Sequence, residues 1–242
     1  MLANTQLSDK IPSVIENGNG AQQSVLQTSH VLGEPIQDDK VDNSYMKKLG
    51  HMLKIVHSVN IDLVGFGSFD ASLNIQNIAE TFPAFLSWKV TQWNHWHSTQ
   101  VESDLANQYF SMLLKSIQPL EKFSSQFAAI FCHGDYDTKN IHQTNGEIAG
   151  IVDWEHSGMF CLSWELRKLF RFFEKQESFF TSFLTGYDEH QTLSTEHLFR
   201  MTKLMAQIDL LGHLRWCMAS NNAIQLSNTK GKMTLILEGG IK

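Results

Sequence analysis

Cysteine is scarce in this sequence: the 242 residues include three, Cys132, Cys161 and Cys217, and no two of them have the C-x-x-C spacing. An odd number of thiols without that spacing is typical of reduced, packed side chains rather than of disulfides or a zinc site. Runs of lysine and arginine are also absent, and the net charge is −6 with a pI near 6.0. These features argue against a nucleic-acid partner.

Long apolar runs are missing as well. No stretch approaches the roughly 20 residues that a membrane-spanning helix needs, and the opening sequence, MLANTQLSDK, has neither the basic nor the apolar segment of a secretory signal. We therefore expect a cytoplasmic protein with no membrane partner. Hydrophobic residues make up 42% of the chain and charged residues 18%, which is enough to bury one good core or to build a large and a small lobe.

The stretch FCHGDYDTKNIHQTNGEIAGIVDWE organises the rest of the chain. The apolar run at its start predicts a buried strand that carries the sequence HGD into a loop ending at Asn140. Asn145-Gly146 then predicts a type I′ hairpin turn, because both residues tolerate a positive φ. Since a hairpin doubles the chain back, we expect Asp153 to return close to Asp135 and Asn140.

Two carboxylates and an amide oxygen around one point suit phosphoryl transfer, in which the protein mainly positions the nucleophile and holds Mg²⁺ against the phosphates. Asp135 would accept or orient the proton of the acceptor hydroxyl. Asn140 and Asp153 would supply the hard oxygen ligands that Mg²⁺ prefers. The D-x-x-x-x-N spacing from Asp135 to Asn140, with Asp153 one hairpin later, matches the catalytic and metal-binding positions of kinases.

The double motif, HGD-x-x-x-x-N from His133 to Asn140 followed by IVDWE at 151–155, resembles the aminoglycoside phosphotransferase and choline kinase family. The resemblance implies an α+β, protein-kinase-like fold, mainly the helical large lobe with a catalytic β-hairpin. It also implies ATP-dependent, Mg²⁺-assisted phosphoryl transfer to the hydroxyl of a small molecule. In this family the position of His133 is usually a loop-shaping residue, and direct proton transfer by His133 is the alternative.

Residues 11–33 predict a hairpin, because two short apolar runs flank the sequence NGNG. Gly18 and Gly20 do not begin a phosphate-binding G-x-G-x-x-G, since position 23 is glutamine and no helical pattern follows. The next segment, VLGEP at 31–35, resembles the hinge by which the family passes from the small to the large lobe. Four residues would then face the nucleotide: Ser29, His30, Val31 and Leu32.

The hinge position divides the chain into a small-lobe remnant at 1–33 and a large lobe at 34–242. Lys10 is the only lysine or arginine before Gly33, so the family's phosphate-binding lysine has no counterpart, nor does its partner glutamate on a helix. The chain is then a fragment or truncated product, or it binds nucleotide in a reduced way. The alternative function is a non-catalytic truncated or pseudokinase module.

Helical periodicity recurs along the large lobe. It predicts helices at 44–58 with Ser44 as N-cap, at 100–118, at 163–185 as one buried central helix, at 196–220, and a short docked helix near 233–237. Glu165 stands where the family has an aspartate that bonds the backbone of the catalytic loop. It either does the same or forms a salt bridge with Arg167 or Lys168.

The acceptor is left open by the sequence. Polycationic aminoglycosides would need acidic residues near the catalytic loop, for which the candidates are Glu155, Asp188, Glu189 and Glu196. A choline-like amine would need aromatic faces, for which the candidates are Trp88, Trp93 and Trp96, unless these only pack the helices. Sugars and homoserine remain possible acceptors. A third interpretation, a transition-metal hydrolase, would use His133, Asp135, His142, Asp153 and His156.

Overall fold

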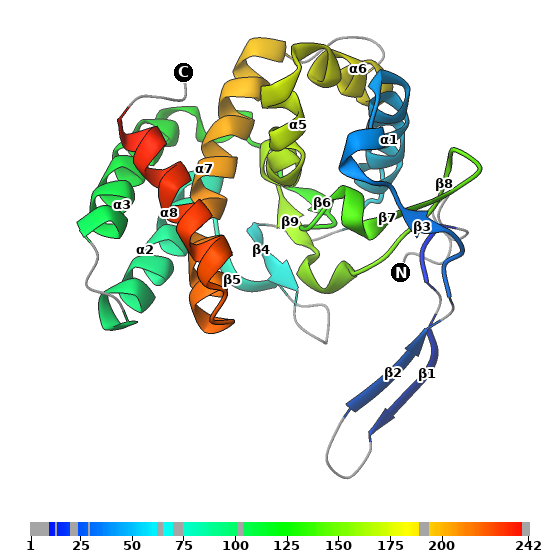
Figure 1. Cartoon of the computed structure of the whole chain (residues 1–242), viewed down its shortest axis with the longest axis horizontal. Coiled ribbons are helices and arrows are strands. Elements are labelled where there is room, and N and C mark those ends of the chain that lie inside the picture. Colours follow the sequence, from blue (N-terminus) through cyan, green and yellow to red (C-terminus); the bar gives the residue numbers. More distant parts are fainter. Residues whose placement is uncertain are drawn as a thin grey trace.

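Helices make up most of the fold, and three small antiparallel sheets hold the loops between them (Figure 1). The computed structural model describes residues 10–12, 14–19, 24–28, 30–61, 65–69, 75–100, 104–188 and 194–238. The architecture is α+β and kinase-like, as the sequence predicts. Among the described residues, no helix is both long enough and apolar enough to span a bilayer.

The α-helices are α1 Asn43–His57, α2 Phe82–Gln100, α3 Asp104–Ile117, α4 Leu162–Glu165, α5 Phe170–Lys175, α6 Glu177–Tyr187, α7 Thr195–Ala219 and α8 Ala223–Leu237. Short 3-10 turns are η2 Asp38–Lys40, η3 Gln118–Gln126, η4 Thr138–Asn140, η5 Trp154–His156 and η6 Leu166–Lys168. The strands are β1 Val14–Asn19 with β2 Ser24–Thr28; β3 Glu34–Pro35 with β7 Ile141–Thr144 and β8 Glu147–Ile151; and β5 Ile75–Ala79, β4 Phe66–Phe69, β9 Gly158–Phe160 and β6 Ile130–Cys132, in that spatial order.

The N-terminal hairpin is present as predicted, with β1 and β2 antiparallel. Figure 1 shows it projecting away from the remainder of the fold. Its turn was misplaced by the sequence reading, because Asn17, Gly18 and Asn19 pair with β2 as part of β1. The connecting residues, 20–23, and Ser29 lie outside the described residues.

The central hairpin β7–β8 also forms as predicted. Its turn residues both have positive φ, 53° at Asn145 and 78° at Gly146, which is the type I′ geometry. The hinge segment adds β3 to the edge of this hairpin, pairing Glu34 with Gln143. Gly33 has a φ of 95°, and a Cβ there would lie 2.3 Å from the Gln143 oxygen, so this crossing requires glycine.

Two helix boundaries differ from the prediction. The N-cap of α1 is Asp42 rather than Ser44, since the Asp42 carboxylate accepts a 2.7 Å hydrogen bond from the Tyr45 N–H. Helix α8 starts at Ala223, well before the predicted 233–237, because Asn222 caps it through the Gln225 N–H. In both cases the capping side chain lies outside the apolar periodicity on which the prediction was based.

The single central helix predicted at 163–185 is wrong. The segment is divided into α4, η6, α5 and α6, and Gln176 is extended at the last break, with φ −151° and ψ 110°. Apolar residues on most of its circumference are equally consistent with several short buried helices. The breaks let Glu165 and Arg167 both reach the catalytic loop, a long-range contact that periodicity does not encode.

Two hydrophobic clusters form the core. One joins α1, α5 and α6 to the central hairpin, and the other joins α2, α3 and α7 to β6 and β9. Helices α1 and α6 approach closely through small residues: a Cβ on Gly50 would lie 2.0 Å from the Phe183 oxygen, and one on Gly186 would lie 2.0 Å from the Lys47 oxygen. Strand β6 contributes to both clusters, with Phe131 in the first and Cys132 in the second, and the loop that contains HGD follows it directly.

A first prediction tests this helix contact. Gly50→Ala should lower the free energy of unfolding by about 1–3 kcal/mol, because the helices must separate to admit the methyl group. Gly231→Ala is the control: its Cβ would meet no described atom within 4 Å, and alanine should stabilise α8 by up to about 1 kcal/mol. Urea unfolding measures both. Equal effects of the two substitutions would contradict close packing of α1 on α6.

Candidate functional site

The catalytic loop begins where strand β6 ends. Strand β6 pairs with β9, placing Cys132 opposite Gly158, and His133-Gly134-Asp135 follows directly. Gly134 has a φ of 82°, and a Cβ there would come within 1.9 Å of the His156 oxygen. Only glycine allows this turn, which presents Asp135 beyond the strand end.

His133 joins the loop to the segment that precedes Asp153. Its side chain is fully buried, Nδ1 accepts a 3.2 Å hydrogen bond from the Asp135 N–H, and Nε2 lies 2.8 Å from the Val152 oxygen. With Nδ1 as the acceptor, the ring hydrogen that faces Val152 is assigned to Nε2. The Val152 N–H also donates to the Asn140 oxygen at 2.9 Å. The end of β8 therefore returns beside the loop, as the hairpin argument predicts.

Asp135 is surrounded by donors of its own chain. Asn140 Nδ2 donates to its backbone oxygen at 2.9 Å and to Oδ2 at 3.0 Å. Lys139 lies 2.9 Å from Oδ2, and Lys168 lies 3.7 Å from Oδ1. Burial raises the pKa of Asp135, but the Lys139 hydrogen bond and the charges of Lys168, Lys139 and Arg167 outweigh it and hold this pKa below its usual value. The carboxylate is therefore ionised and can accept a proton or a hydroxyl hydrogen bond.

Asp153 occupies a left-handed backbone conformation, with φ 64° and ψ 57°. A non-glycine residue in this region is strained and is found most often at functional sites. Its side chain is exposed and near enough to act on Lys139: burial lowers the pKa of Lys139, yet the hydrogen bond to Asp135 and the charges of Asp135, Asp137 and Asp153 raise it above its usual value. Because Asn140 uses its Nδ2 on Asp135, its Oδ1 is the atom left to act as a ligand.

Glu165 bonds the backbone of the catalytic loop, which confirms the first of the two roles predicted for it. The Gly134 N–H donates to both of its carboxylate oxygens, at 3.0 and 3.3 Å, and the side chain is fully buried. Burial raises its pKa, but the hydrogen bond and charge of His57, with His133 and Arg167, hold it below its usual value. The alternative salt bridges do not form, since Arg167 and Lys168 both bind Asp209.

The hydrolase interpretation is not supported by the geometry. Its five residues are all described, yet they do not form a group with the spacing of metal ligands. Among the described residues, the cluster that does is His57, Cys132 and Glu165. Glu165 already accepts from Gly134, His57 Nδ1 contacts the Tyr187 hydroxyl at 2.8 Å, and burial raises the pKa of Cys132 well above its usual value. Hydrogen bonds therefore account for this cluster.

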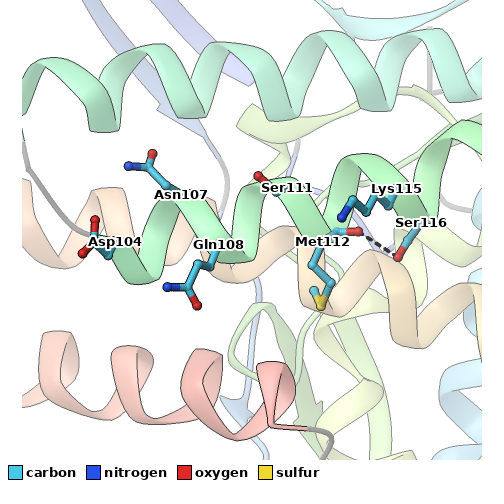
Figure 2. Close-up of a pocket in the computed structure, with 7 residues that line it drawn as sticks. All are labelled: Asp104, Asn107, Gln108, Ser111, Met112, Lys115 and Ser116. Atoms are coloured by element: carbon cyan, nitrogen blue, oxygen red, sulfur yellow. Dashed lines mark hydrogen bonds between the residues drawn. The ribbon is translucent and has the colours of Figure 1, made fainter.

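Two hollows in the surface are large enough for a small molecule. The first, about 610 Å³, is lined by residues of α3 alone (Figure 2). These are Asp104, Asn107, Gln108, Ser111, Met112, Lys115 and Ser116. Figure 2 shows their side chains along one helix, with the Ser116 hydroxyl bonded to the Met112 oxygen. No residue of the loop at 133–140 lines it, whereas Gly134, Asp135 and Lys139 line the second hollow.

The second cavity, about 520 Å³, opens on Asp135. Its basic lining residues are Lys89, Lys139, Arg167 and Lys168. Its aromatic walls include Trp93 from α2, Trp164 from α4 and Trp216 from α7. Asp209 is its second carboxylate, 2.9 Å from Arg167 and 2.8 Å from Lys168.

Sequence reasoning missed several residues of this cavity, among them Lys89 and Asp209. Lys89 precedes Trp93 by one helical turn, so the sequence could have predicted a cation beside the tryptophan cluster. Asp209 stands between apolar residues in the middle of α7, far from the other acid of that helix, Glu196 in its first turn, and this was also visible in the sequence. Of the predicted tryptophans, only Trp93 lines the cavity; Trp88 packs on Phe85 and Trp96 lies beneath Arg215.

The remaining candidates lie elsewhere. Glu155 is largely exposed and contacts His156 at 3.5 Å, neither Asp188 nor Glu196 lines the cavity, and Glu189 is outside the described residues. In the nucleotide segment, Val31 lies against β8, since a Cβ on Gly150 would be 2.5 Å from its Cγ1. His30 and Leu32 are exposed.

The comparisons with known proteins agree with this geometry. The model of the phosphotransferase enzyme family matches residues 6–199. The chain belongs to this family. The comparison with curated protein sequences gives no match.

Solved structures of similar fold include aminoglycoside phosphotransferases. Aminoglycoside phosphotransferase APH(4)-Ia is 17% identical with a TM-score of 0.68, over 96% of this chain and 78% of that one. The GDP and kanamycin complex of APH(2")-IIIa is 13% identical with a TM-score of 0.70, over 96% and 77%. The GDP complex of wild-type aminoglycoside 2'-phosphotransferase-IIIa is 12% identical with a TM-score of 0.69, over 97% and 77%. At these identities the likeness concerns the fold.

A second prediction concerns Asp209. Burial raises its pKa, but Arg167 and Lys168 hold this pKa far below its usual value. Asp209→Asn should lower the free energy of unfolding by about 1–3 kcal/mol at pH 7, because two cations lose a charged acceptor. Because the pKa of Asp209 is lower in the folded than in the unfolded state, its ionisation stabilises the fold at pH values above the unfolded pKa of about 3.9. This stabilisation is lost as the pH falls toward the folded pKa. The difference between wild type and variant should therefore shrink below about pH 4.

The control is Asp104→Asn, which changes an exposed carboxylate on α3. It should alter stability by less than about 0.5 kcal/mol. Urea unfolding from pH 7 to pH 3 gives both series. A deficit in Asp209→Asn that stays constant across this range would rule out the ion-pair contribution.

Proposed function

We propose that this protein transfers the γ-phosphoryl group of ATP to a hydroxyl of a small molecule. The observation that carries the proposal is the ionised Asp135, which lines the cavity while Asn140 and the end of β8 lie beside it. Membership of the phosphotransferase enzyme family supports it. So do similar solved structures described as complexes with ADP and hygromycin B, and with GDP and kanamycin.

In this proposal Asp135 accepts or orients the proton of the acceptor hydroxyl. Its depressed pKa suits that role at neutral pH, since the carboxylate is then ionised. His133 positions Asp135, because both of its ring nitrogens are engaged with backbone atoms. Direct proton transfer by His133 would require one of these bonds to break.

Asn140 Oδ1 and the Asp153 carboxylate would hold Mg²⁺. One amide oxygen and one carboxylate are hard donors, and Mg²⁺ typically takes one or two protein oxygens with phosphate oxygens and retained waters. When bound, the metal would neutralise charge on the transferred phosphoryl group. The chain's own contribution would be to bring these residues together, since the Val152 N–H, next to Asp153, donates to the Asn140 backbone oxygen at 2.9 Å.

The nucleotide would lie against the hinge, with Ser29, His30, Val31 and Leu32 facing the base. This assigns residues 1–33 to the nucleotide side and 34–242 to the large lobe. Lys10, the only lysine or arginine before Gly33, donates to the Ile148 oxygen at 2.8 Å. Phosphate binding would therefore rest on the metal oxygens rather than on Lys10.

The second candidate is a non-catalytic module that binds nucleotide without transfer. Two observations favour it. Lys10 donates to the Ile148 oxygen rather than facing a phosphate site, and the carboxylate oxygens of Asp135 already contact Lys139 and Lys168. Both contacts involve partly exposed lysines, which an acceptor hydroxyl and phosphate can displace. The transferase therefore remains the preferred proposal, and the next experiment distinguishes the two.

A third prediction is that Asp135→Asn lowers phosphoryl transfer by about two to four orders of magnitude, the usual effect of losing a positioned base. ATP consumption would be measured with a panel of hydroxyl acceptors. Asp104→Asn, on the outer face of α3, should leave the rate unchanged. A variant that keeps more than a tenth of the wild-type rate would exclude Asp135 from the mechanism, and a folded wild type that binds ATP but transfers nothing would favour the non-catalytic module.

A fourth prediction concerns metal. Mg²⁺ with ATP should raise the melting temperature, whereas Mg²⁺ alone should change it little, because two protein oxygens do not replace its hydration shell. Asp153→Asn should remove most of the joint shift. The melting temperature would be followed with Mg²⁺, ATP, both, and Zn²⁺. Stabilisation by Zn²⁺ alone, with none from Mg²⁺ plus ATP, would refute the proposed site.

A further inference from the structure

The charges around the second cavity are unequal. Four of its lining side chains are cations and two are carboxylates. Asp135 is paired with Lys139 at 2.9 Å. Asp209 is paired with Arg167 at 2.9 Å and with Lys168 at 2.8 Å. Within the described part of the chain, these pairings use both carboxylates and leave the ammonium of Lys89 without an anion.

Lys89 instead lies among aromatic rings. Its Nζ is 5.3 Å from the ring centre of Trp93, 5.2 Å from that of Trp164 and 5.5 Å from that of Phe85. Aromatic faces stabilise a cation but do not neutralise it. Burial lowers the pKa of Lys89 to about 8, helped by the charges of Arg167 and Lys168 and opposed by Asp209. An anion beside the ammonium would offset this cost.

The same contacts disfavour a cationic acceptor. A choline-like amine would need a free aromatic face, but Lys89 already occupies Trp93 and Trp164, and Arg215 lies over Trp96. A polycationic acceptor would need unpaired carboxylates, and the two that line the cavity already bind this chain's own cations. The lining carries four cations and no unpaired carboxylate, and this positive charge opposes either kind of amine even though Trp216 is 53% exposed.

We propose that the acceptor is an alcohol that also carries an anionic group, a carboxylate or a phosphate, which binds the Lys89 ammonium while the hydroxyl faces Asp135. This rests on the proposed phosphotransferase function and specifies its acceptor. Lys89 and Asp135 line the same cavity, so one molecule can reach both. Trp93 and Trp216, on α2 and α7, provide walls for the body of the acceptor.

The test is binding by calorimetry without nucleotide, so that it does not depend on transfer. Two series vary one substituent: glucose, glucosamine, glucuronate and glucose 6-phosphate; and glycerol, glycerate and glycerol 3-phosphate. In at least one series an anionic member should bind about tenfold or more tightly than the neutral parent, the usual effect of a charged hydrogen bond. The preferred member distinguishes carboxylate from phosphate.

Lys89→Gln should remove this preference, whereas Lys89→Arg should retain it. Lys115→Gln, which deletes an exposed lysine of α3 (Figure 2), is the matched control and should retain it. Melting temperatures check that each variant is folded. If Lys89→Gln does not fold, Lys89→Arg and the pH dependence of the wild type carry the test.

In the wild type, anion affinity should fall as pH rises through about 8, because the Lys89 ammonium loses its proton. The other charged groups facing it are Arg167, Lys168 and Asp209, and His213, whose pKa lies below its usual value, titrates at lower pH. Lys89→Arg should show no fall between pH 7 and pH 9, since arginine keeps its charge. A purely structural lysine would give no such difference.

The proposal is overturned if no anion in either series binds more tightly than its parent, if glucosamine binds best, or if the anion preference survives in folded Lys89→Gln. Failure of transfer to every acceptor, with anion binding intact, would instead refute the phosphotransferase function alone. Transfer to neutral alcohols without an anion preference would refute only the acceptor assignment.

Discussion

The site depends on the backbone N–H and C=O of Gly134. Its N–H donates to the buried carboxylate of Glu165, and its oxygen accepts from Arg167 Nη2 at 2.7 Å. A buried backbone group without a partner costs about 1–3 kcal/mol, so these two contacts decide whether the tight turn at Gly134 can exist. Arg167 also binds Asp209, which couples the catalytic loop to α7 and to the wall of the cavity.

That arrangement explains the irregular path of the chain after β9. A continuous helix would carry Glu165 and Arg167 on faces about 200° apart, yet both must reach the backbone of Gly134. The 3-10 turn η6 directly after α4 meets this requirement. The charged side chains of the cavity are also held by contacts within the chain. Each carboxylate is paired with a lysine or arginine, and the remaining lysine, Lys89, lies against aromatic rings.

Local features were well predicted because their causes are local. The β7–β8 turn follows from Asn145-Gly146, and α7 follows from an apolar period that runs unbroken over many turns. The errors arose where distant groups compete with a local pattern. Asp42 replaced Ser44 as a cap within two residues, whereas the predicted central helix was divided by contacts to a loop about thirty positions earlier in the chain.

The sequence by itself determined the family and the fold class through its two motifs. It also determined that the end of β8 lies near Asp135 and Asn140, because the second strand of a hairpin runs antiparallel to the first and returns the chain to its start. Only the tertiary structure decided which side chains surround the cavity. Lys89 and Asp209 come from helices 120 positions apart in the chain, and no short-range pattern relates them. Whether a tryptophan or a carboxylate can bind a ligand depends on which cation packs against it. These cations come from other helices, so the contacts exist only in the tertiary structure.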